Sequence, residues 1–473
     1  MSSCRVVNWT RSLLLASLIG FSLVPHARAQ APSSPWYTTQ DLNPHSLLDP
    51  PVAREINNAG EIAGYVYTSR YVSWLLTAQA AVFRNGDWVL IDDLADPVPF
   101  PTDSFYPTTR LFGINDLGQA VGYMSTIIST APNDTLNQGV TLSPQATELA
   151  PLSIAPDVFI EGINNSGRIV GSRNDYLDTY PDYFRAFAHD LADGSEIDLD
   201  VLLPTPREES MARDVNDAGD VAGVVYLNGV PGYRAFLYRE NSSQLEVLYG
   251  TNSDHMNRPF AINNRRQIVG QGLLAGVQQK AVVFDANDGT LSGLPTPPGT
   301  LTSLARDIND RGEVVGSMNI NPIGERAFLY RNGQLLDVND LVPPGSPWTL
   351  REAVGINEQG QIIAFWDRPG PPYYRFGHVL LTPTHQRRIT DLIEAVQALQ
   401  AAGVLNGGNT NALVTKLEGA IAQIDKGNVG PAVDKIEAFV NQVQAFIQSG
   451  KLTPAQGQPL IDGANGIIAT LKS

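Results

Sequence analysis

Four acidic side chains are the residues of this sequence best suited to chemistry. They lie near the ends of short apolar segments that recur along the chain, and they are Glu55, Glu161, Asp214 and Asp307. Two carboxyl groups held roughly 5 to 10 Å apart can cleave a glycosidic bond, one as an acid and the other as a base or nucleophile. Three other copies of the segment carry Gly113, Ala261 or Gly355 instead. An arginine also precedes three of the acids, so packing between copies is the competing explanation.

Aromatic and arginine side chains gather in the irregular connections between the recurring segments. Aromatic rings stack on sugar rings or peptide side chains, and a guanidinium group pairs with a carboxylate through two parallel hydrogen bonds. The candidates for ligand binding are Tyr71, Trp74, Tyr106, Arg110, Tyr176, Tyr183, Arg258, Trp348, Arg351, Trp366 and Tyr373. The alternative is that these side chains pack the connections against one another.

Metal and cofactor sites have little support. Three aspartates share one connection, Asp175, Asp178 and Asp182, but calcium needs six or more oxygen ligands, so a solvated loop is the favoured interpretation and calcium the weaker one. The histidines lack the spacing of a zinc site. No phosphate-binding or dinucleotide-binding fingerprint and no Gly-x-Ser-x-Gly elbow occurs. We therefore expect no cofactor.

The elements that must position these residues are repeats. The pattern Ile/Val-Asn-x-x-Gly-x-apolar-x-Gly begins at Ile56, Ile114, Ile163, Val215, Ile262, Ile308 and Ile356. A second motif, such as Arg-Ala-Phe-Leu-Tyr-Arg-Asn-Gly at 326–333, follows most copies. Each unit is interpreted as four short strands, A to D, and four strands in ~50 residues is typical of a propeller blade. The B–C and D–A connections, which carry the candidate aromatic residues, share one face of such a ring.

The Asn-x-x-Gly segment is interpreted as a tight turn between strands A and B. The asparagine side chain can bond the backbone two residues on, and glycine accepts the positive φ that such a turn needs. Two copies depart from the pattern. In the fifth, Arg266 replaces the turn glycine, which predicts a strained or differently shaped turn. The second lacks a clear strand C around Gly139 to Pro144.

The order of the strands predicts a closed ring. Residues 36–42 have the form of a strand D with no A, B or C before them, and the seventh unit stops after strand C near 378–381. The first strand can therefore complete the last blade, which removes both exposed sheet edges. We predict a seven-bladed β-propeller of four-stranded blades, closed by the N-terminal strand.

The two repeat motifs resemble the HAF-type extracellular repeat of bacterial proteins over roughly residues 36 to 383. The resemblance implies export and a propeller-like fold, and it implies no established reaction.

A different pattern begins after Pro383. Apolar residues recur at helical spacing, and glycines divide the segment into helices near 386–402, 409–426, 430–449 and 454–472. About four helices of this length can form a small bundle with its own core. The segment resembles the helical FIMAH-type module of bacterial extracellular proteins. That resemblance suggests attachment or interaction, with an envelope partner as one possibility, rather than chemistry.

The N-terminus has the form of an export signal. Arg5 and Arg11 precede or begin an apolar run that ends at Val24, and Ala27-Arg28-Ala29 has the form of a cleavage site. The run is too short for a transmembrane helix, and no later segment is apolar enough. We expect three parts: a cleaved signal over 1–29, the propeller over 30–383 and the helical module over 384–473. The protein is then secreted, periplasmic or at the cell surface.

Two functions from different classes remain. The formal net charge of −16 disfavours nucleic acid as a partner, because nucleic acid selects basic surfaces. The favoured hypothesis is a binding protein that recognises an extracellular glycan, polymer or protein through the aromatic connections. The alternative is a glycan hydrolase or lyase that uses the four acids at the mouth of the channel.

Overall fold

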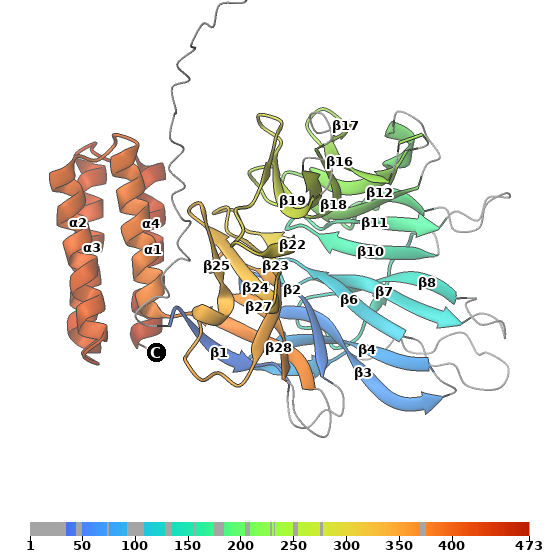
Figure 1. The fold of residues 1–473 in the computed structure, drawn as a ribbon, viewed down its shortest axis with the longest axis horizontal. Helices are drawn as coiled ribbons and strands as arrows, with labels where there is room; N and C mark the ends of the chain where they lie inside the picture. Colours follow the sequence, from blue (N-terminus) through green and yellow to red (C-terminus); the bar gives the residue numbers. More distant parts are fainter. Residues whose placement is uncertain are drawn as a thin grey trace, which may run out of the picture.

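A computed structural model gives the conformation of most of the chain. It describes residues 35–43, 50–72, 75–91, 108–127, 135–154, 157–174, 184–203, 209–227, 229–230, 232–248, 254–274, 278–368 and 375–472. Four-stranded antiparallel sheets follow one another around a ring, and a group of helices lies beside the ring (Figure 1). The predicted seven-bladed propeller with a C-terminal helical segment is confirmed.

The blades follow the repeats. Blades 1 and 2 comprise β2 (Pro51–Ile56), β3 (Ile62–Val72), β4 (Leu75–Arg84) and β5 (Asp87–Leu90), then β6 (Thr108–Ile114), β7 (Ala120–Ile127), β8 (Thr135–Leu142) and β9 (Ala150–Pro151). Blades 3 and 4 comprise β10 (Val158–Ile163), β11 (Arg168–Asn174), β12 (Phe184–Asp190) and β13 (Glu196–Asp198), then β14 (Ser210–Val215), β15 (Val221–Tyr226), β16 (Tyr233–Arg239) and β17 (Gln244–Val247). Blades 5 and 6 comprise β18 (His255–Ile262), β19 (Gln267–Leu274), β20 (Gln278–Asp285) and β21 (Thr290–Gly293), then β22 (Thr300–Ile308), β23 (Val314–Ile320), β24 (Gly324–Arg331) and β25 (Gln334–Asp337). Blade 7 comprises β26 (Thr349–Ile356), β27 (Ile362–Arg368), β28 (Arg375–Pro383) and β1 (Tyr37–Asp41).

Closure of the ring occurs as the strand order predicts. Strand β1 pairs antiparallel with β28, with Tyr37 opposite Pro383 and Asp41 opposite Val379. Tyr37 is buried in the core between blades 6 and 7. The N-terminal strand therefore gives blade 7 its fourth strand, and the ring has no open seam at this junction.

The Asn-x-x-Gly turns have the predicted internal bonds. In the first turn, Oδ1 of Asn57 accepts the backbone N–H groups of Ala59 at 3.1 Å and Glu61 at 2.9 Å. Gly60 has a φ of 79°, and Arg266 takes the same left-handed region at 63° in the fifth turn. The departure predicted for Arg266 is thus confirmed as strained backbone, and its Nε lies 2.6 Å from Oδ2 of Asp220.

The same asparagines also join the blades, a role that the sequence did not suggest. The Nδ2 of each donates to the backbone carbonyl of the next repeat's asparagine, at 2.9 to 3.2 Å. The members of this asparagine ring are Asn57, Asn115, Asn164, Asn216, Asn263, Asn309 and Asn357. All are buried, so each bond is protected from water, and each contributes about 1 kcal/mol to stability.

The glycine that ends the repeat motif allows two backbones to approach closely. A Cβ on Gly64 would lie 2.1 Å from the carbonyl oxygen of Val52, and one on Gly171 would lie 2.0 Å from that of Phe159. Both are impossible contacts, so the first strand could not stay in place. The seventh repeat has Ala364 at the equivalent position.

The second repeat forms its third strand although the motif is missing. Strand β8 pairs with β7 along its length. Val140 and Leu142 are fully buried in a core that also holds Leu111. Every second side chain at the end of β8 is therefore buried, as the apolar residues of the Ala-Phe-Leu-Tyr motif are in other repeats. The second repeat thus has a regular third strand although its sequence lacks the motif.

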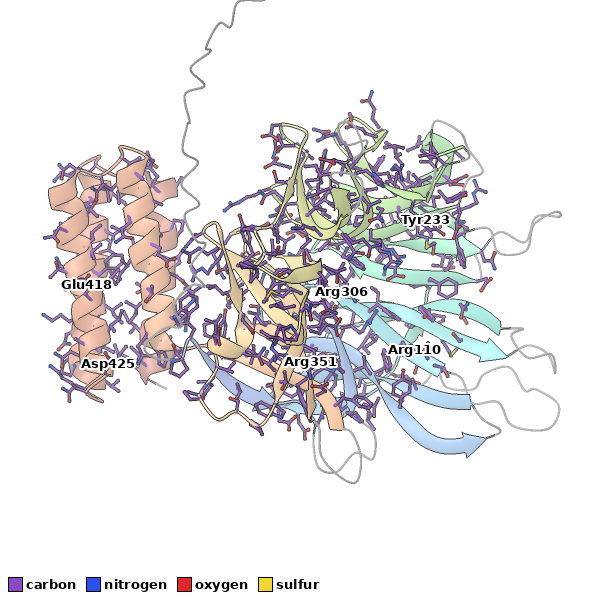
Figure 2. All side chains as sticks on the ribbon, viewed as in Figure 1. Arg110, Tyr233, Arg306, Arg351, Glu418 and Asp425 are labelled. Carbon is purple, nitrogen blue, oxygen red and sulfur yellow. The ribbon has the colours of Figure 1, made fainter. Side chains whose placement is uncertain are left out.

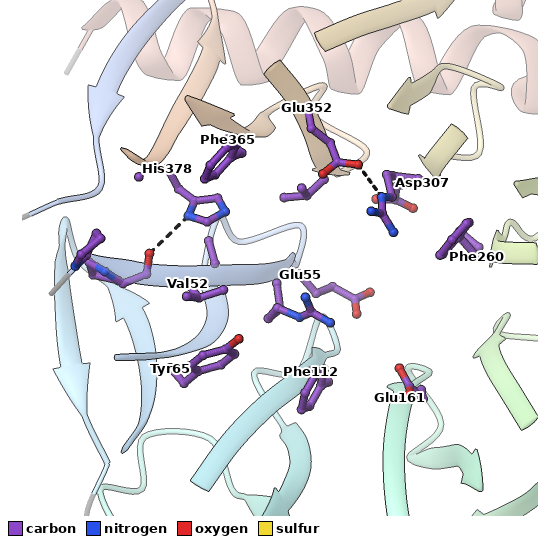
Figure 3. Close-up of a pocket in the computed structure, with 18 of the residues that line it drawn as sticks. Val52, Glu55, Tyr65, Phe112, Glu161, Phe260, Asp307, Glu352, Phe365 and His378 are labelled. Atoms are coloured by element: carbon purple, nitrogen blue, oxygen red, sulfur yellow. Dashed lines mark hydrogen bonds and ion pairs between the residues drawn. The ribbon is translucent and has the colours of Figure 1, made fainter. Parts of the chain in front are cut away.

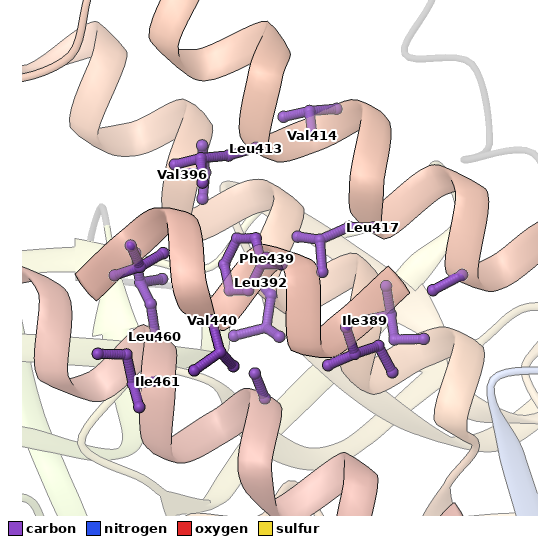
Figure 4. Close-up of a cluster of buried hydrophobic side chains, with 14 of the residues drawn as sticks. Ile389, Leu392, Val396, Leu413, Val414, Leu417, Phe439, Val440, Leu460 and Ile461 are labelled. Atoms are coloured by element: carbon purple, nitrogen blue, oxygen red, sulfur yellow. The ribbon is translucent and has the colours of Figure 1, made fainter. Parts of the chain in front are cut away.

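The C-terminal segment forms α1 (His385–Ala401), α2 (Gly407–Ile424), α3 (Val429–Gln448) and α4 (Pro454–Lys472). Their shared core includes Ile389, Leu413, Phe439 and Ile461 (Figure 4). None of these helices is both long and apolar enough to cross a membrane, as judged over the described residues.

Helix α1 is attached to the propeller by buried charges. Arg387 reaches back from α1, and its Nη2 lies 3.3 Å from Oε1 of Glu313 in blade 6. Arg331 reaches forward from blade 6, and its Nη2 lies 3.1 Å from Oδ1 of Asp391. Both guanidinium groups also lie over the ring of Trp36, at 4.6 and 5.5 Å from its centroid. Blade 6, the residue that precedes β1 and the first helix therefore meet at one point.

Candidate functional site

A cavity of about 740 Å³ occupies the centre of the ring, between the first strands of the blades (Figure 3). A smaller hollow of about 230 Å³, lined by the Asn-x-x-Gly turns, lies at the other end of the channel. Glu55, Asp214 and Asp307 line both. These three acids therefore mark the narrow level between the two ends.

A β-bulge in every first strand decides which side chains enter the cavity. The pairing register shifts by one residue just before each Ile-Asn or Val-Asn pair. A bulge re-aims the extra residue. The seven bulge residues all line the cavity, and they are Arg54, Phe112, Glu161, Arg213, Phe260, Arg306 and Val354. Each bulge residue lies two positions before the isoleucine or valine of the Ile-Asn or Val-Asn pair, as Arg54 does before Ile56. This spacing could have identified all seven residues from the sequence.

The bulge separates Glu161 from the other candidate acids. Glu55, Asp214 and Asp307 directly precede the Ile-Asn or Val-Asn pair, whereas Glu161 lies one residue earlier, at the bulge. Glu161 therefore lines only the larger cavity. Its Oε1 lies 3.2 Å from Nη1 of Arg213 in the next blade. Burial raises the pKa of Glu161 against the opposing charge of Arg213.

Asp214 and Asp307 each join two neighbouring blades. The carboxylate of Asp214 accepts the N–H of Val215 on one oxygen and the N–H of Ile262, in the next blade, on the other, both at 2.8 Å. Asp307 does the same with Ile308 and Ile356 at 2.7 Å. Burial raises the pKa of Asp214 to about 7 and that of Asp307 to about 6, although these N–H groups favour the charged forms. Both oxygens of each acid are occupied by the fold.

Glu55 is the acid that the fold leaves without a hydrogen bond among the described residues. Burial, followed by the charges of Asp214 and Asp307, raises its pKa well above the usual value. A glycosidase pair needs two carboxyl groups that both reach the substrate. The four acids do line one channel. However, Asp214 and Asp307 accept hydrogen bonds from backbone N–H groups, and Glu161 forms an ion pair with Arg213.

Six aromatic rings form a continuous arc over blades 1 to 3. Successive ring centroids lie 5.1 to 6.5 Å apart, the spacing of favourable aromatic pairs. The members of this aromatic arc, in order, are Tyr67, Tyr65, Phe112, Tyr123, Phe159 and Phe184. Tyr65 is buried and the other five are half-buried. The sequence did not single them out, because they come from three different strand positions.

Two guanidinium groups lie on the rings of this arc. Arg54 of blade 1 lies over Phe112 of blade 2, with its central carbon 4.7 Å from the ring centroid. Arg110 of blade 2 lies over Tyr65 of blade 1 at 5.3 Å. The Nε of Arg110 is buried and has no hydrogen-bond partner.

Blade 7 completes the aromatic lining. Phe376 is 50% exposed, and its ring centroid lies 6.3 Å from that of Phe365. Phe365 also contacts the imidazole of His378, whose Nδ1 lies 3.2 Å from the carbonyl oxygen of Pro51. Burial lowers the pKa of His378 to about 4, so the ring is neutral at pH 7. His378 is therefore part of the wall.

The other predicted binding residues lie elsewhere. Trp366 is 5% exposed and packs against Trp348 in the core between blades 6 and 7. The Nε of Arg351, which is labelled in Figure 2, lies 2.7 Å from Oδ1 of Asp367, and Arg351 does not line the cavity. Arg258 is exposed on β18 and does not line the cavity.

Several of the predicted residues cannot be placed. Trp74, Tyr106, Tyr176, Tyr183 and Tyr373 lie outside the described residues, as do Asp175, Asp178 and Asp182. Tyr71 belongs to β3, but its side chain is not among those described. Within the described ranges, no group of three or more His, Asp or Glu side chains is arranged to hold a metal ion.

Comparison with known proteins identifies the helical segment. Residues 389–469 match the model of the FIMAH domain, as the resemblance in the sequence implied. No curated protein matches the chain. The likeness of the seven repeats to the HAF type stays a prediction.

Solved structures resemble the propeller at low identity. One, from a study of two prolyl endopeptidases, is 9% identical with a TM-score of 0.47, and the match covers 72% of this chain and 51% of that one. Pyrococcus horikoshii acylaminoacyl peptidase is 12% identical with a TM-score of 0.45, covering 71% and 54%. The β-propeller domain of the Trilobed protease from Pyrococcus furiosus is 9% identical with a TM-score of 0.47, covering 70% and 93%. The chain spans about half the length of the first two, and likeness at this level does not extend to function.

Proposed function

We propose that this protein binds an extracellular glycan, polymer or protein at the mouth of the propeller channel and performs no chemistry on it. The observation that carries the proposal is the aromatic arc, whose members Tyr65, Tyr67 and Phe112 line a cavity of about 740 Å³. Half-buried rings held by one another lose little freedom when a ligand stacks on them. A wide concave site lined by aromatic rings and by polar groups at fixed positions is typical of ligand binding.

The opposite wall of the cavity supplies polar groups at fixed positions. Arg213 pairs with Glu161, and the Nε of Arg306 lies 2.6 Å from Oε1 of Glu352. Each pair keeps further donors and acceptors available for hydroxyl or amide groups. The cavity thus offers rings on blades 1, 2, 5 and 7 and hydrogen-bonding side chains on blades 1, 3, 4, 6 and 7.

The location and the helical segment belong to the same proposal. We infer that residues 1–29 direct export, so that the site meets its ligand outside the cytoplasm or in the periplasm. The helical segment then binds a second partner, with the cell envelope as the candidate.

The test uses purified residues 30–473 on arrays of glycans and of extracellular protein fragments. We expect a ligand whose binding is weakened at least tenfold by Phe112→Ala, because the substitution removes a ring for stacking and part of the cavity wall. The matched control is Tyr226→Ala. Tyr226 is also a half-exposed aromatic residue, paired with Tyr233 at 5.6 Å on blade 4 (Figure 2), outside the cavity. Equal binding by both variants would remove the arc from the site.

The alternative, a glycan hydrolase or lyase, rests on Glu55. This carboxyl group lines the cavity, and its raised pKa suits a general acid. A second uncommitted acid is missing from the described lining, which is why binding is preferred. Release of soluble products from a polymer by the wild-type protein, abolished by Glu55→Gln, would establish the enzyme instead.

A further inference from the structure

Arg54 and Arg110 differ from the other cavity-side and inter-blade arginines in lacking an acidic partner. Arg84, Arg168, Arg213 and Arg306 each have a carboxylate oxygen within 3.2 Å. This is expected in a chain whose formal net charge is −16. Neither Arg54 nor Arg110 has an ion pair with any residue in the described part of the chain.

The two guanidinium groups are held in a crossed arrangement. Arg54 of blade 1 lies on Phe112 of blade 2, and Arg110 of blade 2 lies on Tyr65 of blade 1. The centroids of these two rings, both of which line the cavity, are 6.5 Å apart, so the two cations lie over neighbouring rings at one blade junction. Both charges also act on the Tyr65 hydroxyl. Like charges repel, and this pair is stabilised when an anion lies between them.

The terminal N–H groups of both guanidinium groups have no hydrogen-bond partner among the described residues, whereas Nε of Arg110 is buried. An arginine that lies flat on a ring satisfies its faces, while its N–H donors point outward in the plane. Those donors match the two oxygens of a carboxylate. The charge of Arg54 acts on the carboxyl groups of Glu55 and Glu161, but neither forms an ion pair with it. The carboxylate must therefore come from the ligand.

We propose that the crossed pair Arg54/Arg110 is a carboxylate-binding subsite, and that the ligand of the cavity is a uronate-bearing polysaccharide. The inference rests on the proposed function and narrows its ligand class. The rings of the aromatic arc take the apolar face of a sugar unit, and the Arg213–Glu161 pair offers hydrogen bonds to neighbouring hydroxyl groups. An acidic sugar presents a ring, hydroxyls and a carboxylate within one unit, which this combination fits.

The experiment measures the binding of short oligouronates by calorimetry to the purified residues 30–473. The panel contains galacturonate, guluronate, mannuronate and glucuronate oligomers, their neutral methyl esters and a sulfated dextran fragment. We expect at least one oligouronate to bind, its ester to bind at least tenfold more weakly, and binding to weaken as salt is added. Arg54→Met and Arg110→Met each lower the affinity roughly ten- to hundredfold.

Arg265→Met is the matched control. Arg265 is an exposed arginine of the fifth Asn-x-x-Gly turn, at the opposite end of the channel, and its removal leaves the affinity unchanged. The melting temperature separates binding from folding. Because neither arginine has a protein counter-ion, Arg54→Met and Arg110→Met should keep or raise the melting temperature of the ligand-free protein, whereas a structural role predicts a fall.

Three results overturn the inference: no oligouronate binds, the ester binds as tightly as the acid, or the sulfated fragment binds at least as tightly as the uronates. The proposed function is tested apart from it. A neutral glycan or a protein whose binding depends on Phe112 but not on Arg54 would keep the binding role and remove the acidic ligand.

Discussion

The Nδ2 atom of Asn357 donates a hydrogen bond of 2.9 Å to the backbone carbonyl oxygen of Asn57, 300 residues earlier in the chain. The bond joins blade 7 to blade 1, where the ring closes. It has the same donor and acceptor as the bonds at the other junctions of the asparagine ring. The junction made by distant parts of the chain is thus built like those between neighbours.

Replacing one member of the asparagine ring should weaken both a turn and a blade junction. Asn357→Ala leaves the N–H groups of Gln359 and Gln361 without partners. It also removes the inter-blade donor to the carbonyl of Asn57, which then keeps only the N–H of Gly60 from its own turn. We expect a loss of about 2 to 3 kcal/mol in the free energy of unfolding, measured by urea denaturation. Asn411→Ala, on the exposed surface of α2, is the control and should change it by less than about 0.5 kcal/mol.

The channel acids should make the propeller less stable as pH rises. Asp214 has a raised pKa of about 7 in the folded state, so the folded state binds a proton that the unfolded state has already lost above pH 4. This contribution is complete below about pH 4 and disappears as pH passes 7. Relative to Asp214→Asn, the wild type should lose on the order of 2 kcal/mol between pH 5 and pH 8. Asp434→Asn, at an exposed site of α3, should keep the wild-type slope, and a wild type no steeper than Asp214→Asn would contradict the assignment.

Gly171, which ends the motif of the third repeat, should tolerate no side chain. Gly171→Ala places a Cβ against the carbonyl oxygen of Phe159, and the first strand must move. We expect a loss of about 3 kcal/mol or more, or no soluble protein. In Gly430→Ala the new methyl group meets no atom within 4 Å, and α3 should gain up to about 1 kcal/mol. Thermal denaturation of both variants measures the difference.

The contact between α1 and the propeller should depend on its buried charges. Arg387→Ala removes a partner of Glu313 and one of the cations over Trp36. Breaking a buried ion pair typically costs about 3 kcal/mol or more, so the helices should separate from the ring. Limited proteolysis near Thr384 and an increased radius of gyration in X-ray scattering would report the separation. Lys472→Ala, which removes an exposed pair with Glu437, should change neither.

The repeats made the architecture predictable. Seven copies of one motif, an unpaired strand at 36–42 and helical periodicity after Pro383 each specify a local structure. Together they leave one arrangement in which every blade has four strands. Even the weak second repeat follows, because the neighbouring blades require a strand there.

The site was harder to predict because it depends on register and on partners. Glu161 differs from Asp214 by one residue relative to the motif, and only the bulge shows that this places them at different levels. Trp366 is an aromatic residue of the kind that often binds ligands. However, strand β27 extends beyond the end that the repeat pattern indicates, so Trp366 lies within this strand and its ring is buried. A contact such as Arg54 on Phe112 joins two repeats and leaves no trace in either one alone.

The pairing of β1 with β28 also sets the order in which the chain can fold. Thr38 bonds to Thr382, 344 residues later, so β1 has no partner until nearly the whole propeller has been synthesised. Until then Tyr37 stays exposed and the ring remains incomplete. Contacts between such distant residues form slowly, because a long loop must close first. A chain that ends before β28 would keep most of its blades but could not complete blade 7, and β1 would have no strand to pair with.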